Sequence, residues 1–164
     1  MEKDIYYMRL AIASAKEGID NNEYPFGCCI VTDDEEYVVA CNSCFTDSNP
    51  LMHAEIRAMN KMFDELKVTS LQNTTIYTTT IPCLMCIGAI SWAKIPRLVY
   101  GLSINDSINC DFEEINYDIN SIINIFPYKI EVVKSELTNE CLDLYNQWNK
   151  KNRILRWFKG KLKD

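Results

Sequence analysis

Two short motifs supply the side chains of this chain that are best suited to bind a metal. His53-Ala54-Glu55 contains the only histidine, and Pro82-Cys83-Leu84-Met85-Cys86 follows thirty residues later. The two cysteines are three residues apart and therefore lie on one face of a helix. Both motifs stand where a helix is expected to begin, and the free N–H groups and dipole of a helix start favour thiolate. The spacing thus predicts a site of one imidazole and two thiolates, which suits zinc.

Three protein ligands leave the fourth tetrahedral position to water, and this open position distinguishes a catalytic zinc from a structural one. We predict one Zn²⁺ per chain, held by His53, Cys83 and Cys86, with water as the fourth ligand. Zinc lowers the pKa of such a water to roughly 7. Glu55 lies about 200° around a helix from His53 and can reach that water from a first turn. Its predicted role is proton transfer.

Three other interpretations of the motifs are open. A Cys-x-x-Cys pair can be a redox dithiol, although redox chemistry has no need of His-x-Glu. Cys110 could close the site as a fourth ligand and make the zinc purely structural. The chain could also be an inactive scaffold stabilised by zinc, but a structural site has no use for a carboxylate such as Glu55 beside its ligand.

The elements that position these motifs follow from periodicity, turn signals and β-branched runs. Strands alternate with single helices, which predicts an α/β fold: a three-layer α-β-α sandwich whose mixed sheet is covered on both faces. Residues 102–127 show weak periodicity and carry no assignment. The expected elements are a helix at 4–18, a hairpin of strands at 26–31 and 37–41, a helix at 53–66, a strand at 74–80, a helix from Pro82 to about Lys94, strands at 97–101 and 128–134, and a helix at 137–151.

Composition indicates a globular, cytoplasmic protein. The chain has 164 residues, 48% of them apolar and 24% charged, which fits one domain spanning 1–164. No signal-like segment or membrane-spanning apolar run is present, and we expect the eight cysteines to be reduced thiols or metal ligands.

Charge divides the chain unevenly. Residues 1–148 carry 10 Lys and Arg against 22 Asp and Glu, a balance of −12, whereas the tail at 149–164 carries 7 against 1. This basic, amphipathic tail is either a nucleic-acid contact or a solvated helix that packs on a core or partner surface.

The two motifs together resemble the cytidine and deoxycytidylate deaminase-like superfamily of zinc deaminases. The likeness runs from about Met8 to Gly101 through MRLAIASAKEG, PFGCCIV, HAEIRAM and IYTTTIPCLMCIGAISWAKIPRLVYG. It implies a five-stranded mixed sheet between helices, with zinc at two helix N-termini. The branch most similar to this chain holds guanine and nucleoside deaminases, tRNA adenosine deaminases and fungal-type cytosine deaminases.

The resemblance also implies residues that recognise the substrate. Asn42 would hydrogen-bond the base, Phe26 and Trp92 would wall the pocket, the Ala54 amide would face the substrate, and Glu114 of Phe112-Glu113-Glu114 would read the base. Each has a plain structural alternative: a turn at the strand end for Asn42, core packing for the two aromatic rings, and a solvated loop for Glu114. Ile81 stands where many relatives carry Glu, and this change could alter water acidity or substrate choice.

The resulting functional hypothesis is hydrolytic removal of an exocyclic amine from a purine base or nucleoside, guanine first, with release of ammonia. One alternative is deamination of adenosine in tRNA, with the basic tail against phosphate. Another is deamination of cytosine or a related aminopyrimidine, because Thr-Thr-Ile-Tyr-Thr-Thr before the Pro-Cys motif resembles that branch. The expected partners are a small nucleobase or nucleoside and a second copy of the chain in a homodimer, with no membrane.

Overall fold

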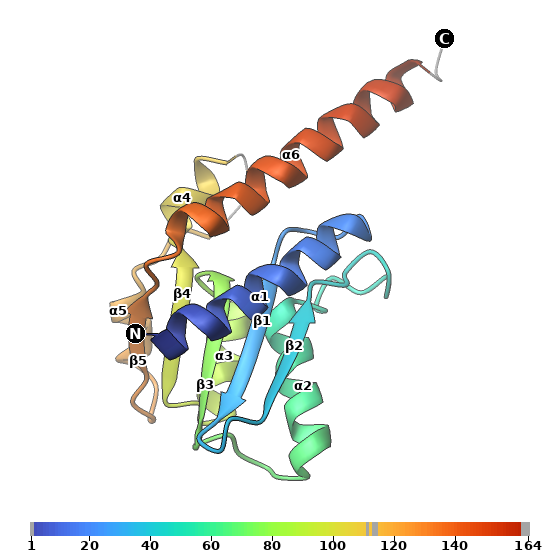
Figure 1. The fold of residues 1–164 in the computed structure, drawn as a ribbon. Coiled ribbons are helices and arrows are strands. Elements are labelled where there is room, and N and C mark those ends of the chain that lie inside the picture. Colours follow the sequence, from blue (N-terminus) through green and yellow to red (C-terminus); the bar gives the residue numbers. More distant parts are fainter. Residues whose placement is uncertain (1, 111, 113–114, 162–164) are drawn as a thin grey trace.

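The computed structural model describes residues 2–110, 112 and 115–161, with side chains up to residue 152. Five strands form one sheet in the order β2-β1-β3-β4-β5 (Figure 1). Their bounds are β1 Gly27–Thr32, β2 Tyr37–Cys41, β3 Thr74–Thr80, β4 Arg97–Leu102 and β5 Glu131–Lys134.

The sheet is mixed, as the sequence predicts. β1 is antiparallel to both β2 and β3, whereas β3, β4 and β5 run parallel to one another. A parallel pair needs a crossover, and the helix α3 (Leu84–Trp92) provides it between β3 and β4. The start of α3, which carries the Pro-Cys motif, therefore lies just past the C-terminal end of β3, the central strand of the sheet.

Helices cover both faces of the sheet, which confirms the expected α/β architecture (Figure 1). The helices α1 (Glu2–Asp20) and α6 (Thr138–Lys161) pack on one face, and α2 (Ala54–Leu66) and α3 pack on the other. Side chains alternate along each strand. In β1, Cys28 belongs to the core under α2 and α3, whereas Cys29 belongs to the core under α1 and α6.

A glycine and an ion pair set the position of α1. A Cβ on Gly27 would lie 2.1 Å from the Ala11 carbonyl oxygen, so the helix rests directly on the β1 backbone. At the other end of α1, both guanidinium NH₂ groups of Arg97 donate to the Asp4 carboxylate at 2.8 and 3.1 Å. The Tyr77 hydroxyl donates to the same carboxylate at 2.7 Å. The chain thus fixes α1 against β1, β3 and β4.

Residues 102–127 contain two short helices, α4 (Ile104–Ile108) and α5 (Ile119–Ile123). Each begins at a side-chain cap: the Ser103 hydroxyl accepts from the Asp106 N–H, and the Asp118 carboxylate accepts from the N–H groups of Asn120 and Ser121. Five residues are too few to show a helical period, so hydrophobic patterning gave no assignment here.

The last helix differs from the expected one in length. α6 continues to Lys161 and includes most of the basic tail. The Lys151 ammonium donates to the Ile19 and Asp20 carbonyls at the end of α1, at 2.5 and 3.0 Å. It thereby satisfies carbonyls that have no partner inside α1. In the part of the chain that the structure describes, no helix, α6 included, is long and apolar enough to cross a membrane.

Candidate metal centre

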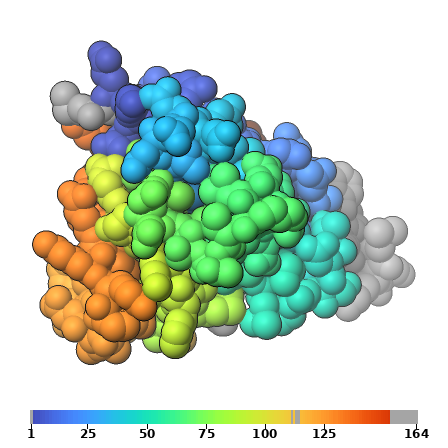
Figure 2. Space-filling model, turned by 90° about the horizontal axis from the view of Figure 1, so that it is seen from below, coloured from blue at the N-terminus to red at the C-terminus, as the bar shows by residue number. Residues whose placement is uncertain are grey.

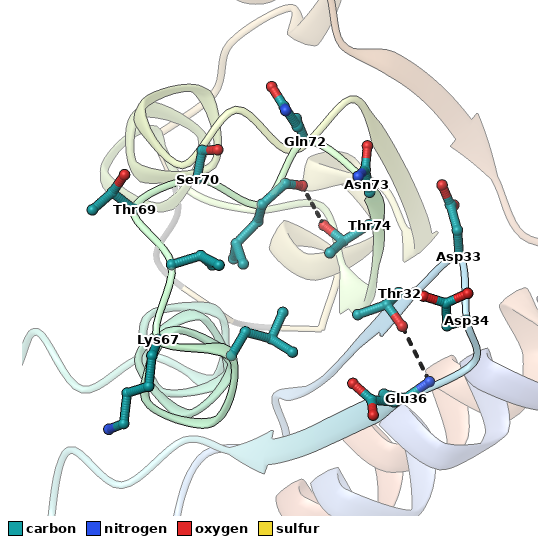
Figure 3. A pocket seen from close by; sticks show the side chains of 13 residues that line it. Thr32, Asp33, Asp34, Glu36, Lys67, Thr69, Ser70, Gln72, Asn73 and Thr74 are labelled. Carbon is teal, nitrogen blue, oxygen red and sulfur yellow. Dashed lines mark hydrogen bonds between the residues drawn. The ribbon is translucent and has the colours of Figure 1, made fainter.

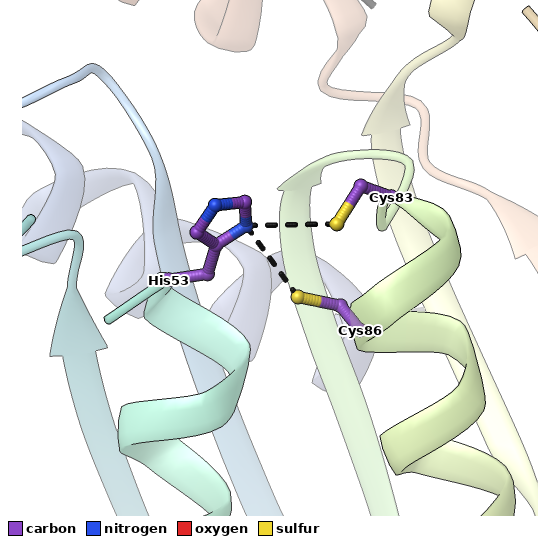
Figure 4. A group of neighbouring side chains, drawn as sticks. All are labelled: His53, Cys83 and Cys86. Atoms are coloured by element: carbon purple, nitrogen blue, oxygen red, sulfur yellow. Dashed lines mark hydrogen bonds between the residues drawn. The ribbon is translucent and has the colours of Figure 1, made fainter. Parts of the chain in front are cut away.

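The two motif residues His53 and Cys83 lie immediately before helices that meet at their N-termini (Figure 4). Each is the N-cap residue of its helix, with extended backbone at ψ 155° for His53 and 169° for Cys83, and neither side chain caps its own helix. The imidazole and the thiol are therefore free of that local role and point toward each other. Cys86, in the first turn of α3, joins them from below.

The distances in this group fit a tetrahedral zinc ion. His53 Nδ1 lies 3.6 Å from both Cys83 Sγ and Cys86 Sγ, and all three donor atoms lie within 4.8 Å of one another. Bond lengths of about 2.0–2.1 Å for Zn–N and 2.3 Å for Zn–S place a nitrogen and a sulfur about 3.6 Å apart at the tetrahedral angle. Among the described residues this is the single group of three His, Cys, Asp or Glu side chains that could hold a metal.

The electrostatics of the pair of thiols favour a thiolate. A hydrogen bond from Cys86 lowers the pKa of the Cys83 thiol well below its usual value, and contacts with His53 and the Cys86 backbone N–H lower it further. Donation of that hydrogen bond, together with burial, raises the pKa of Cys86. The site therefore presents a thiolate at neutral pH, the form of cysteine that binds a metal.

Among the described residues, Glu55 is the one acid beside this group that is almost fully buried. It lies in the first turn of α2, and its side chain is 7% exposed. Burial, with a smaller contribution from the charge on Cys83, raises the pKa of its carboxyl to about 7. A carboxyl with this pKa can both accept and release a proton near neutral pH, as general acid–base catalysis requires.

A small cavity of about 40 Å³ adjoins the group. Its walls come from the two motifs, from the start of β1 and from the end of β3; the lining residues are Phe26, Gly27, His53, Glu55, residues 78–81 and Cys83. Phe26, predicted as a pocket wall, is among them. Ala54 is 1% exposed and lies between His53 and Glu55 at the start of α2.

A larger hollow of about 590 Å³ lies at the opposite end of the sheet (Figure 3). It is lined by Thr32, Asp33, Asp34, Glu36 and residues 66–74, with no histidine or cysteine. Seen from this end, the molecule shows the blue β1–β2 turn, the green segment before β3 and the orange segment before β5 (Figure 2). The larger hollow therefore contains none of the predicted metal ligands, whereas the small cavity is lined by His53, Glu55 and Cys83.

The predicted substrate contacts of Asn42 and Trp92 stay predictions, and the structure gives the surroundings of both residues in the chain. The Asn42 side chain accepts a hydrogen bond from the Cys44 N–H at 3.0 Å, and its amide nitrogen lies 3.2 Å from Cys44 Sγ, so it turns the chain after β2. Trp92 ends α3 about 13 Å along the helix from Cys83 and is 82% exposed. Trp92 is not among the residues that line the small cavity of its own chain, because the length of α3 separates it from that cavity. Glu114 lies outside the described residues.

The structure also bears on two residues near the motifs. Cys110 does not belong to the three-residue group; its carbonyl accepts a hydrogen bond from Asn149, and its side chain packs in the core under α1 and α6. A closed site with Cys110 as fourth ligand is therefore not formed. Ile81 is 8% exposed and gives the cavity an apolar wall.

Sequence reasoning missed several polar groups that support the site. Thr80 at the cavity shares a 2.8 Å hydrogen bond with the buried Tyr145 hydroxyl, so α6 reaches the site through a hydroxyl contact. Glu23 is 2% exposed, and its carboxylate accepts the N–H groups of Phe45 and Thr46 at 3.1 and 2.6 Å. It thereby holds the loop that leads to His53. No short motif marks these residues, because their partners are distant in sequence.

Comparison with known proteins identifies a matching family model, relatives in sequence and similar solved structures. The family model described as the cytidine and deoxycytidylate deaminase zinc-binding region matches residues 1–102. A probable cytosine deaminase of Schizosaccharomyces pombe is 31% identical over 146 residues, covering 86% of this chain and 89% of the relative. A tRNA-specific adenosine deaminase of Buchnera aphidicola is 32% identical over 152 residues, covering 93% and 97%. The solved guanine deaminase of Bacillus subtilis is similar with a TM-score of 0.64 at 28% identity, covering 88% of this chain and 92% of that one.

Proposed function

Because this chain belongs to the cytidine and deoxycytidylate deaminase family, we propose that it hydrolyses the exocyclic amine of a free nucleobase or nucleoside, with guanine as the first substrate to test. The observation that carries the proposal is the position of Glu55, a buried carboxyl beside a three-ligand metal group and its cavity. A closed structural site would have four protein ligands and no need of that carboxyl.

In the proposed reaction the ring carbon that bears the amine gains an oxygen from water and loses ammonia. His53, Cys83 and Cys86 would hold zinc, which would supply an activated water at neutral pH. Glu55 would carry one proton of that water to the ring nitrogen and then the second, from the hydroxyl added to the ring carbon, to the amine, which would leave as NH₃. Phe26, which was predicted to form a wall of the substrate pocket, lines the small cavity beside these groups.

Charge favours a free base over a polyanion. Residues 1–148 carry a balance of −12, so a tRNA would meet a repulsive field. Lys151 of the basic tail donates to α1 carbonyls. A tRNA substrate nonetheless has support in the 32% identical relative, which is named as a tRNA-specific adenosine deaminase. It should reveal itself by affinity for tRNA that falls steeply with salt.

Cytosine is the second candidate substrate, because the relative named as a probable cytosine deaminase is similar over 86% of this chain. A panel distinguishes the candidates: guanine, cytosine, adenine, their nucleosides, aminotriazines and tRNA, each with zinc-loaded protein and ammonia release as the signal. Turnover of guanine well above that of cytosine would support the purine assignment. The opposite ranking would replace it, and ammonia release from tRNA alone would refute the choice of a free base.

The role of Glu55 is tested by Glu55→Gln, which keeps the shape of the side chain and removes the ionisable group. Zinc content should stay at one ion per chain while ammonia release falls by about 10²–10⁴-fold. Glu65→Gln is the matched control, because Glu65 lies on the same helix and is exposed. Retention of full activity by Glu55→Gln would contradict the proposed proton transfer.

We also propose that the chain forms a homodimer through the outer face of α3. This face carries no charge and includes Leu84 and Trp92, which are 37% and 82% exposed, with Gly88 between them. A Cβ on Gly88 would meet nothing within 4 Å in its own chain, so a second backbone can approach there. Sedimentation velocity should show a dimer that Trp92→Glu dissociates; a monomer in the unchanged protein would refute this surface.

A further inference from the structure

One buried hydroxyl at the cavity has no protein partner. Thr78 in β3 is 1% exposed, and its Oγ1 is the single buried side-chain nitrogen or oxygen of the described residues without a hydrogen bond to another protein group. Most buried polar groups are hydrogen-bonded, and a buried hydroxyl without a partner is costly. The partner of Thr78 should therefore be a molecule that enters the cavity.

The strand register shows where this hydroxyl points. Ile76 of β3 packs in the core under α2 and α3, and Thr78 follows two residues later, so it faces the same side of the sheet. Cys28 stands directly opposite Thr78 on β1. Burial is the largest cause of the raised pKa of the Cys28 thiol, and the negative charge of Glu55 is the second cause. Glu55 is therefore near the patch of sheet that Thr78 and Cys28 form, and it lines the same cavity as Thr78.

Thr78 and Glu55 both line the cavity of about 40 Å³. A polar space of about 10–15 Å³ is enough for one water molecule, whereas pockets for small organic ligands typically exceed about 300 Å³. A water also requires two or more polar partners. A hydroxyl and a carboxyl supply a donor and acceptors. The occupant that matches the size and the polar groups is a single water.

We propose that Thr78 is a positioning residue for the deamination: its hydroxyl and the Glu55 carboxyl share one buried water, and this water fixes the orientation of Glu55. The hydroxyl donates to the water, and the water donates to one carboxylate oxygen, which leaves the other oxygen for proton transfer. The catalytic consequence rests on the proposed function, whereas the water site itself does not.

The experiment combines three variants with two kinds of measurement. Thr78→Val removes the hydroxyl at nearly constant volume, Thr78→Ser retains a hydroxyl, and Thr75→Val makes the same change on β3 away from the cavity. We expect kcat to fall about tenfold in Thr78→Val, the effect of one lost orienting hydrogen bond, with KM within about twofold. Thr78→Ser and Thr75→Val should keep the kcat of the unchanged protein.

High-resolution crystal structures and urea denaturation test the water site without any turnover. The unchanged protein should show a water within about 3 Å of both Thr78 Oγ1 and the Glu55 carboxyl, and Thr78→Val should lack it. Absence of that water in the unchanged protein would overturn the proposal, as would equal kcat values for Thr78→Val and Thr78→Ser. A higher urea midpoint for Thr78→Val would also overturn it, because loss of an unsatisfied buried hydroxyl stabilises a protein.

The two proposals fail in different ways. If the zinc-loaded protein releases no ammonia from any substrate of the panel, the proposed function is wrong, while the crystal structures and urea midpoints still decide whether the water is there. If the protein is active and the water is absent, only the role of Thr78 is lost.

Discussion

The Asp4–Arg97 pair should hold the N-terminal helix on the sheet, and Asp4→Asn tests this. Asp4 accepts two hydrogen bonds from Arg97 and one from the Tyr77 hydroxyl. The two charged side chains are 29% and 26% exposed, between a surface pair and a buried pair. Exposed pairs contribute about 0–1 kcal/mol, and breaking a buried pair costs about 3–5 kcal/mol. Asparagine keeps one acceptor oxygen, so we expect a loss of about 2 kcal/mol at pH 7.

The loss of stability caused by Asp4→Asn should change with pH in a direction that can be measured. The hydrogen bonds from Arg97 hold the pKa of Asp4 below its usual value, even though burial opposes them. Stabilisation by Asp4 is therefore complete above the unfolded pKa of about 3.9 and disappears as the pH falls through the lower folded pKa. Protonated aspartic acid resembles asparagine in charge, so the difference between Asp4→Asn and the unchanged protein should shrink toward zero in acid.

The assay is urea denaturation of both proteins between pH 7 and about pH 2.5, followed by circular dichroism. Lys3→Gln serves as control, because Lys3 pairs with Glu35 at an exposed site and should contribute nothing measurable. The reasoning is refuted if Asp4→Asn behaves like Lys3→Gln at pH 7, or if its loss of stability is the same at both ends of the pH range.

Two further predictions follow from the packing and the metal site. Gly27→Ala places a Cβ 2.1 Å from the Ala11 carbonyl and should cost about 3 kcal/mol in urea denaturation; a change below about 0.5 kcal/mol would show that α1 can move aside freely. Removal of zinc by a chelator should lower the thermal midpoint and open Cys83 to thiol reagents near neutral pH, whereas Cys28 and Cys141, with pKa values raised by burial, stay unreactive until the protein unfolds. Equal labelling before and after chelation would speak against metal binding by Cys83.

The sequence predicted the sheet and its four main helices because long periodic segments carry their own signal. The stripe of Met8, Ile12 and Ala15 marks α1, and the β-branched run at 74–80 marks β3. The short helices α4 and α5 were not predicted, because five residues do not complete two helical turns and show no clear period. β5 begins at Glu131, three residues later than the strand expected from residue 128. Its start depends on pairing with β4, which local patterning does not contain.

The candidate metal ligands could be predicted from the sequence because His53, Cys83 and Cys86 lie in short motifs. Each motif stands at a helix start, and Asn49-Pro50 and Pro82 indicate these starts in the sequence. Chain order and spacing alone determine which residue types can meet. The 3.6 Å distances from His53 Nδ1 to the two sulfur atoms require the N-termini of α2 and α3 to meet at one end of the sheet. Only the tertiary fold brings these two helix ends together.

Other parts of the site were decided by tertiary structure alone. The alternation of β3 places Thr78 at the cavity that Glu55 also lines, the length of α3 separates Trp92 from that cavity, and α6 brings Tyr145 to Thr80. These contacts join residues far apart in the chain, and each depends on strand register or helix length rather than on a local pattern. The sequence by itself therefore determined the chemistry of the metal group, whereas the fold decided which side chains surround it.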